Sequence, residues 1–278
     1  MNSPALPTRR NPTDKGELRL VHQHRSFATF RTIGALILRE MSASNGRAAG
    51  GYLWAIAEPV GGILILTIIF SLGFRSPPIG TNFAIFYATG IVPFTMYMAM
   101  SNTIARTIQQ SKALLTYPAV TFMDALIARC IFNAITQILV AYIIFFGIYT
   151  MTETRTDPQM DQIALSIAMA LVFGTAIGVM NCFLFSAFPV WEQIWSILSR
   201  PLFLVSCIFF IYDEIPEQIA YWLWFNPLVH LVGQMRRAFY PSYVGDYVSP
   251  LYVFSVSLVI LAIGLGLLVR YHRDLQHS

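Results

Sequence analysis

Five long apolar runs dominate this 278-residue chain, at residues 52–74, 83–104, 122–149, 163–188 and 251–269. Each is long enough to cross a bilayer, because about 20 apolar residues in a helix span about 30 Å of hydrocarbon. A sixth run, 191–211, is also mainly apolar but contains Glu192 and Arg200. Only 12% of the residues are charged, compared with about 25% in soluble domains. The pattern therefore predicts an all-α integral membrane protein with six transmembrane helices.

Basic residues concentrate before the first run and indicate the orientation of the chain. They are Arg9, Arg10, Lys15, Arg19, Arg25, Arg31, Arg39 and Arg47. By the positive-inside rule the N-terminus is predicted to be cytoplasmic, and the first 26 residues show no apolar signal-peptide segment. Six crossings return the C-terminus, with Arg270 and Arg273, to the same side. The net charge of +4 is thus interpreted as membrane orientation and contact with anionic lipid, with no nucleic-acid partner.

The chain divides into four predicted segments. Residues 1–25 form a mobile cytoplasmic tail, and residues 26–49 form an amphipathic helix at the inner membrane interface, where Phe27, Phe30 and Ile37 share one face. Residues 50–270 form the six-span domain, and residues 271–278 a cytoplasmic tail.

A stretch between the fifth and sixth spans is too broken to cross the membrane. Pro216 and Pro227 divide residues 213–240 into two short helix-length pieces rich in aromatic and basic residues. We expect a re-entrant helical hairpin at the outer membrane face, where it would serve as a gate or a substrate platform.

Several kinds of chemistry are excluded by the residues. The two lysines, Lys15 and Lys112, follow Asp14 and Ser111, so the chain has no Gly-Lys-Ser/Thr phosphate loop. No motif of a serine hydrolase or zinc protease occurs, and the three cysteines are interpreted as apolar filler within spans. We therefore predict a transport subunit that is not an enzyme, with no metal and no cofactor of its own.

Few ionisable residues are predicted to lie deep in the membrane, which disfavours proton-coupled transport. They are Glu58, Asp124, Arg129 and Arg200, and whether these residues pair with one another stays open.

A set of motifs in a fixed order resembles a known family. It comprises Leu38-Arg-Glu40, Gly46-Arg47, Gly51-Tyr-Leu-Trp-Ala55, Glu58-Pro59, Ser199-Arg-Pro-Leu202 and the hairpin containing Asn226-Pro227 and Arg236-Arg-Ala-Phe-Tyr-Pro241. Over residues 26–270 the chain resembles the membrane subunit of an ABC-2 type exporter, specifically the capsular polysaccharide permeases of the KpsM type.

The resemblance implies a fold, partners and a location. It implies the ABC-2 (type V) exporter fold, in a homodimer in the bacterial inner membrane that binds two copies of a cytoplasmic ATPase (KpsT-like), which uses ATP and Mg. The other implied partners are a periplasmic polysaccharide co-polymerase (KpsE-like), an outer-membrane channel and a lipid-linked glycan. The ATPase-coupling segment would contain Gln110, Ser111, Lys112, Leu114, Tyr117 and Pro118. The alternatives are export of O-antigen or teichoic-acid-type polymers, or a membrane-bound glycan-modifying transferase that would need a His/Asp constellation around His230.

A sliding, often anionic glycan needs many weak contacts, which aromatic faces and scattered cations provide. Arg200 is the strongest candidate, because an arginine near mid-membrane is costly and is expected to face a cavity or a partner such as Glu58. The full predicted path is Arg200, Tyr52, Trp54, Glu58, Tyr221, Trp222, Trp224, Arg236, Arg237 and Tyr240. The competing interpretations are an interfacial aromatic belt for the tyrosines and tryptophans, and lipid phosphate contacts for Arg236 and Arg237.

Overall fold

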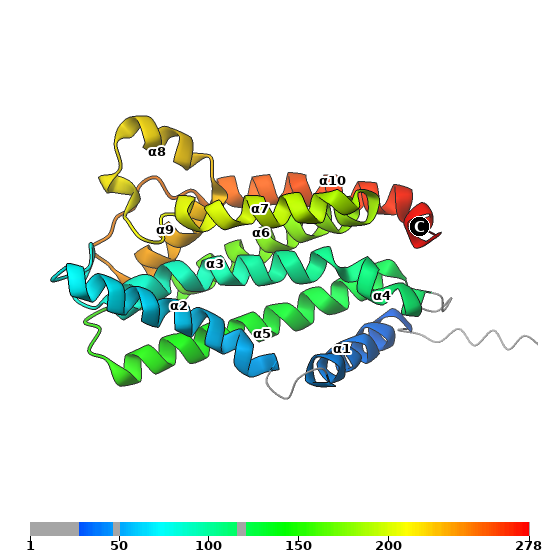
Figure 1. Ribbon diagram of the computed structural model, residues 1–278, viewed down its shortest axis with the longest axis horizontal. Coiled ribbons are helices and arrows are strands. Elements are labelled where there is room, and N and C mark those ends of the chain that lie inside the picture. Colours follow the sequence, from blue (N-terminus) through cyan, green and yellow to red (C-terminus); the bar gives the residue numbers. More distant parts are fainter. Residues whose placement is uncertain (1–27, 47–50, 116–120, 278) are drawn as a thin grey trace, which may run out of the picture.

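The computed structural model describes residues 28–46, 51–115 and 121–277 of the chain, and within these ranges it is helical without strands (Figure 1). The helices are α1 (Ala28–Gly46), α2 (Gly51–Gly73), α3 (Phe83–Ala105), α4 (Thr107–Leu115), α5 (Phe122–Met151), α6 (Met160–Ala187), α7 (Pro189–Val205), a short 3-10 helix (Tyr212–Glu214), α8 (Glu217–Trp224), α9 (Pro227–Phe239) and α10 (Pro250–His277). The predicted mobile tail, residues 1–25, lies outside the described residues.

Five helices of the described chain are long and apolar enough to cross a membrane: α2, α3, α5, α6 and α10. They coincide with the five long apolar runs. The sixth run differs from the prediction of a continuous span, because α7 has 17 residues and ends at Val205. Cys207 then adopts a left-handed backbone conformation with φ of 57°, and the chain stays non-helical to Ile211.

The helix α3 is the centre of the molecule. Most of its spanning segment is buried, and it packs against α6, α5, α2 and α9. Its contact with α6 is close because Gly174 and Gly178 face it: a Cβ at Gly174 would lie 2.7 Å from the Cβ of Met100. Glycines at this spacing allow two membrane helices to approach backbone to backbone.

The two helices of the predicted hairpin differ in burial. The helix α8 is mostly exposed, whereas nearly every residue of α9 is buried against α3 and α6. Pro227 starts α9 at a position where its missing N–H costs nothing, and Asn226 caps the helix by accepting from the N–H of Leu228 at 3.1 Å. The second helix of the hairpin is therefore part of the core.

The two ends of the bundle carry different elements. In Figure 1, α1, α4 and the C-terminal end of α10 lie at one end, and α8 lies at the other. Arg129 of α5 holds α1 in place through an ion pair with Glu40 at 3.2 Å. Asp124 has a separate role, since it forms a capping box with Thr121 at the start of α5. The partner of Arg129 thus comes from another helix, and Asp124 and Arg129 do not pair with each other.

Candidate functional site

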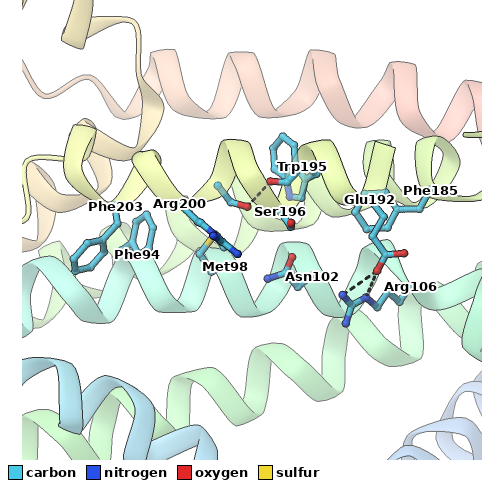
Figure 2. Close-up of a pocket in the computed structure, with 11 residues that line it drawn as sticks. Phe94, Met98, Asn102, Arg106, Phe185, Glu192, Trp195, Ser196, Arg200 and Phe203 are labelled. Atoms are coloured by element: carbon cyan, nitrogen blue, oxygen red, sulfur yellow. Dashed lines mark hydrogen bonds and ion pairs between the residues drawn. The ribbon is translucent and has the colours of Figure 1, made fainter. Parts of the chain in front are cut away.

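A hollow of about 390 Å³ lies between α3 and α7 (Figure 2). From α3 and its C-cap come Phe94, Met98, Asn102 and Arg106, spaced four residues apart so that they share one helix face. The facing wall is α7, with Phe185 of α6 at one end; the α7 residues are Glu192, Trp195, Ser196, Ser199, Arg200 and Phe203. These also recur at three- and four-residue steps, so α7 presents one mixed polar and aromatic face to the hollow.

A second hollow of about 400 Å³ lies on the other flank of α3, against α2. It is lined by Trp54 and Glu58 of α2 and by Gln137 of α5, and it shares Phe94, Met98 and Asn102 with the first hollow. The two hollows therefore meet along one face of α3. We call the combined surface the α3 groove.

Three members of the predicted path lie in the α3 groove. Arg200 lines one hollow, and Trp54 and Glu58 line the other. The side chain of Trp54 is 72% exposed, and those of Glu58 and Arg200 are also exposed. The rival interpretation, an ion pair between Arg200 and Glu58, is not realised, because the ion pairs among the described residues involve neither of them.

The groove contains an ion pair that connects its two walls. The Nη2 and Nε atoms of Arg106 lie 3.0 and 3.1 Å from Oε1 of Glu192. The two side chains are 49% and 38% exposed, so the pair contributes about 1 kcal/mol or less to stability. Sequence reasoning missed this pair, because its residues are 86 positions apart. The four-residue spacing of the groove-lining residues along α3 was the sequence pattern that could have indicated this wall of the groove.

The predicted outer residues separate into exposed and buried sets. Tyr221 and Trp222 of α8 are 62% and 74% exposed, and Arg237 is half-buried. Trp224 is also half-buried, and its indole N–H donates to the carbonyl of Tyr247 at 3.2 Å. Tyr240 is buried, which removes it as a stacking surface in this conformation.

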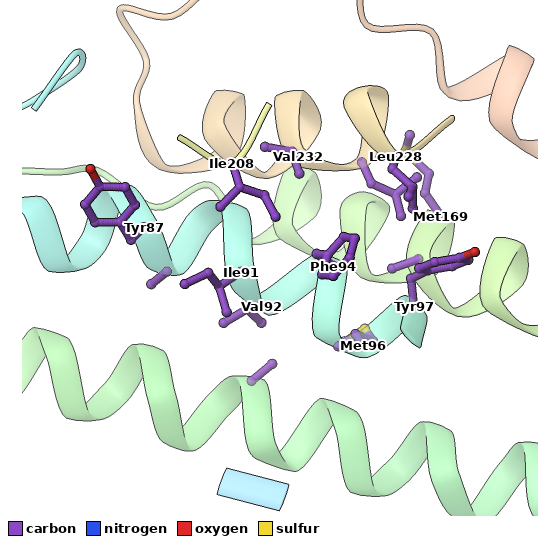
Figure 3. Close-up of a cluster of buried hydrophobic side chains, with 14 of the residues drawn as sticks. Tyr87, Ile91, Val92, Phe94, Met96, Tyr97, Met169, Ile208, Leu228 and Val232 are labelled. Atoms are coloured by element: carbon purple, nitrogen blue, oxygen red, sulfur yellow. The ribbon is translucent and has the colours of Figure 1, made fainter. Parts of the chain in front are cut away.

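Arg236 was expected to attract anions at the outer face, and this expectation of an accessible side chain is wrong. The residue is fully buried, and it donates to the carbonyls of Phe210 at 2.8 Å and Ile208 at 2.9 Å. Its guanidinium also lies 4.5 Å from the ring centre of Phe86. The two carbonyls belong to the non-helical stretch after α7 and need donors, because they are buried and no helical N–H pairs with them. The side chain of Ile208 packs in the core cluster with Ile91 and Val232 (Figure 3).

Part of the predicted coupling segment lies in α4. There Gln110 is exposed and Ser111 is buried. The helix also includes Lys112 and Leu114, whose side chains are outside the described residues, as is the side chain of Tyr52 in α2. Tyr117 and Pro118 lie outside the described residues altogether.

The ring of His230 is held by hydrogen bonds to backbone groups. Its Nε2 lies 2.8 Å from the carbonyl of Trp224, and its Nδ1 accepts from the N–H of Ser249 at 3.2 Å. Both ring nitrogens are therefore occupied by backbone groups. In the described ranges no group of three or more His, Cys, Asp or Glu residues is placed to hold a metal ion. This arrangement gives no support to a transferase centre at His230.

Comparisons with known proteins agree with these features. The ABC-2 type transporter family matches residues 31–240. The polysialic acid transport protein KpsM of Escherichia coli is 32% identical over 236 residues, which cover 85% of this chain and 92% of that protein. The capsule polysaccharide export inner-membrane protein CtrC of Neisseria meningitidis serogroup A is 24% identical over 247 residues, with 88% and 93% covered. BexB of Haemophilus influenzae, another capsule polysaccharide export inner-membrane protein, is 27% identical over 251 residues with the same coverage. The resemblance seen in the sequence motifs is confirmed, and the chain belongs to the ABC-2 type transporter family.

Proposed function

We propose that this chain is the permease subunit of an ATP-driven ABC exporter that moves lipid-linked capsular polysaccharide across the inner membrane. The relatives named for polysialic acid transport and capsule polysaccharide export support the class of cargo. The structural observation that carries the proposal is the α3 groove, which has aromatic, hydroxyl, amide and cationic groups along one continuous face.

The chemistry of the groove suits a polymer that must slide. Trp195 and Phe203, both half-buried, offer ring faces on which sugars stack, and Asn102 and Ser196 offer hydrogen bonds that exchange readily. Arg200 supplies a cation for phosphate or carboxylate groups. Since these contacts are spread along two helices, no single position holds the glycan tightly.

A second copy of the chain completes the path in this proposal. The groove is open, and the helices that flank it, α2 and α7, expose large apolar side chains such as Leu53, Ile197 and Leu204. A homodimer that buries these flanks would close two grooves into one channel and remove the apolar side chains from contact with lipid.

The proposed topology has six crossings, with α7 and its non-helical extension to Ile211 as the fifth. An even number of crossings agrees with the position of α1, α4 and the end of α10 at the same end of the bundle in Figure 1. That end is cytoplasmic in the proposal. The hairpin of α8 and α9 then lies toward the periplasm, facing the co-polymerase (KpsE-like) and the outer-membrane channel.

Two copies of a cytoplasmic ATPase (KpsT-like) supply the energy by using ATP and Mg, and α4 is the proposed docking element. Gln110 on this helix is exposed, and Lys112 follows it two positions later. A cysteine introduced at Lys112, in a background without Cys130, Cys182 and Cys207, should form a cross-link to the co-purified ATPase. A cysteine at Tyr221 on α8 is the control. Cross-linking from position 221 and not from 112 would contradict this docking mode.

Replacement of Arg200 tests the transport path. In a strain lacking the natural chain, Arg200→Gln should assemble normally but leave glycan inside the cell, whereas Arg75→Gln, outside the groove, should restore surface glycan. Full export by Arg200→Gln would show that Arg200 does not serve the path. Analysis of the intracellular glycan in the deletion strain also separates capsule from O-antigen or teichoic-acid-type cargo.

A further inference from the structure

The ion pair between Arg106 and Glu192 lies at one end of the α3 groove. In Figure 2 the hollow runs from Phe94 and Phe203 at one end, past Arg200 and Asn102, to the ion pair at the other. Arg106 belongs to the α3 wall and Glu192 to the first turn of α7. Their contact therefore bridges the two walls across the mouth of the hollow.

This mouth is next to the proposed ATPase-docking helix. Arg106 is the C-cap of α3, and α4 starts at the next residue, Thr107. A displacement of α4 would act directly on the backbone that carries the Arg106 side chain. The ion pair thus lies where cargo would enter and where nucleotide-driven movement would arrive.

The geometry of the ion pair allows Arg106 to exchange Glu192 for another anion. The Nε and Nη2 atoms of Arg106 both approach the same oxygen, Oε1 of Glu192, instead of using both carboxylate oxygens. The bidentate fork that makes arginine–carboxylate pairs strong is therefore not formed. Since both side chains are also well exposed, another anion can reach the guanidinium.

The charges along the hollow favour an incoming anion. Arg106 and Arg200 both line it, and among the described residues around this first hollow Glu192 is the one carboxylate, while Glu58 lines the second hollow of the groove. When Glu192 releases Arg106, the groove gains a second available cation on the way to Arg200. An anionic oxygen group of the glycan, either the phosphate at its lipid anchor or a carboxylate along the sugar chain, matches this arrangement.

We propose that Arg106 is the entry residue that selects anionic glycans, and that Glu192 occupies it and bridges the groove mouth until a phosphate or carboxylate of the cargo takes its place. This inference rests on the proposed export function. It assigns cargo selection to the inner mouth of the groove, in addition to the path residue Arg200.

A reversible cross-link in place of the ion pair tests the bridge across the mouth. Arg106→Cys and Glu192→Cys are combined in a chain without Cys130, Cys182 and Cys207, and the complex with its ATPase is placed in nanodiscs. The probe is lipid-linked glycan extracted from the strain that lacks this chain. A bis-methanethiosulfonate cross-linker should abolish stimulation of the ATPase by glycan, and a reductant should restore it. Each single cysteine variant, treated in the same way, is the control.

Charge-neutral variants test the selection. Glu192→Gln removes the competitor of the cargo and should lower the half-saturating glycan concentration about fivefold, the factor that matches the loss of one surface ion pair. Arg106→Gln should raise that concentration by a similar factor although Arg200 is intact. Assays with the lipid phosphate anchor alone and with glycan released from its anchor show which anionic group acts on Arg106.

The outcomes separate this inference from the function on which it rests. If the wild-type complex binds no ATPase or shows no response to the extracted glycan, the proposed export function fails. If the wild-type complex responds, but the cross-linked complex responds equally or both neutral variants keep the wild-type half-saturating concentration, the entry role of Arg106 and Glu192 is overturned.

Discussion

The Nη2 atom of Arg236 donates a hydrogen bond to the carbonyl oxygen of Ile208 at 2.9 Å, across 28 positions of the chain. Its Nη1 atom donates to the carbonyl of Phe210 at 2.8 Å. From the start of the same helix, Asn226 donates to the carbonyl of Val205 at 3.1 Å. The helix α9 therefore supplies the donors that allow α7 to end and the chain to continue without helical hydrogen bonds.

Replacing Arg236 should destabilise this junction. Arg236→Met keeps the length of the side chain but leaves two buried carbonyls without donors. We therefore expect the free energy of unfolding to fall by about 2–4 kcal/mol. Arg237→Met is the matched control on the same helix, where the side chain is half-buried, and should cost less than about 1 kcal/mol. Thermal unfolding in detergent, followed by fluorescence-detected gel filtration, measures both. Equal melting temperatures for the two variants would show that the carbonyl contacts do not hold the junction.

The comparison of Arg236 with Arg237 shows why part of the site escaped prediction. The two are neighbours in the sequence and were treated alike, yet one is fully buried and the other half-buried. The face of α9 that packs against the core decides between them. That face depends on α3 and α6, whose contacts with α9 come from distant parts of the chain.

The five long spans were predictable because a bilayer requires continuous apolar length, which is a local property of the sequence. The end of α7 at Val205 was not, since the donors for its carbonyls lie on another helix. Arg200 was expected to face a cavity or a partner because a charge in an apolar run is costly, and it lines the first hollow. The Arg106–Glu192 pair, with 86 positions between its members, was not.

Two glycines allow a test of the contact between α3 and α6. A Cβ at Gly174 would lie 2.7 Å from the Cβ of Met100 and 3.0 Å from the carbonyl oxygen of Tyr97, whereas a Cβ at Gly147 of α5 would meet nothing within 4 Å. Gly174→Ala should therefore destabilise the protein by about 1–3 kcal/mol through overpacking. Gly147→Ala should stabilise it by up to about 1 kcal/mol through helix propensity. Melting temperatures that shift in the same direction would contradict the close approach at Gly174.

The ion pair between Glu40 and Arg129 attaches α1 to α5. The Arg129 side chain is 6% exposed, and Glu40 lies 3.2 Å from its Nη2 atom. Glu40→Gln leaves a buried cation without its counter-charge and should cost about 3–5 kcal/mol. The double variant Glu40→Gln/Arg129→Met removes both charges, so it should recover much of this loss. A double-mutant cycle from thermal unfolding measures the coupling, and strictly additive losses would exclude it.

The buried ring of His230 predicts a pH dependence of stability. Burial lowers the pKa of His230, and the backbone N–H of Ser249 faces Nδ1, the atom that would accept a proton. The unfolded chain therefore takes up a proton below pH of about 6.5 before the folded protein does. At higher pH we expect His230 to have no effect on stability. As the pH falls below 6.5, its titration should lower the free energy of unfolding by up to about 1.4 kcal/mol per pH unit. Melting temperatures between pH 8 and pH 5 should fall more steeply for the wild-type chain than for His230→Gln, which has no titrating ring. Parallel curves for the two chains would mean that His230 does not set the acid sensitivity.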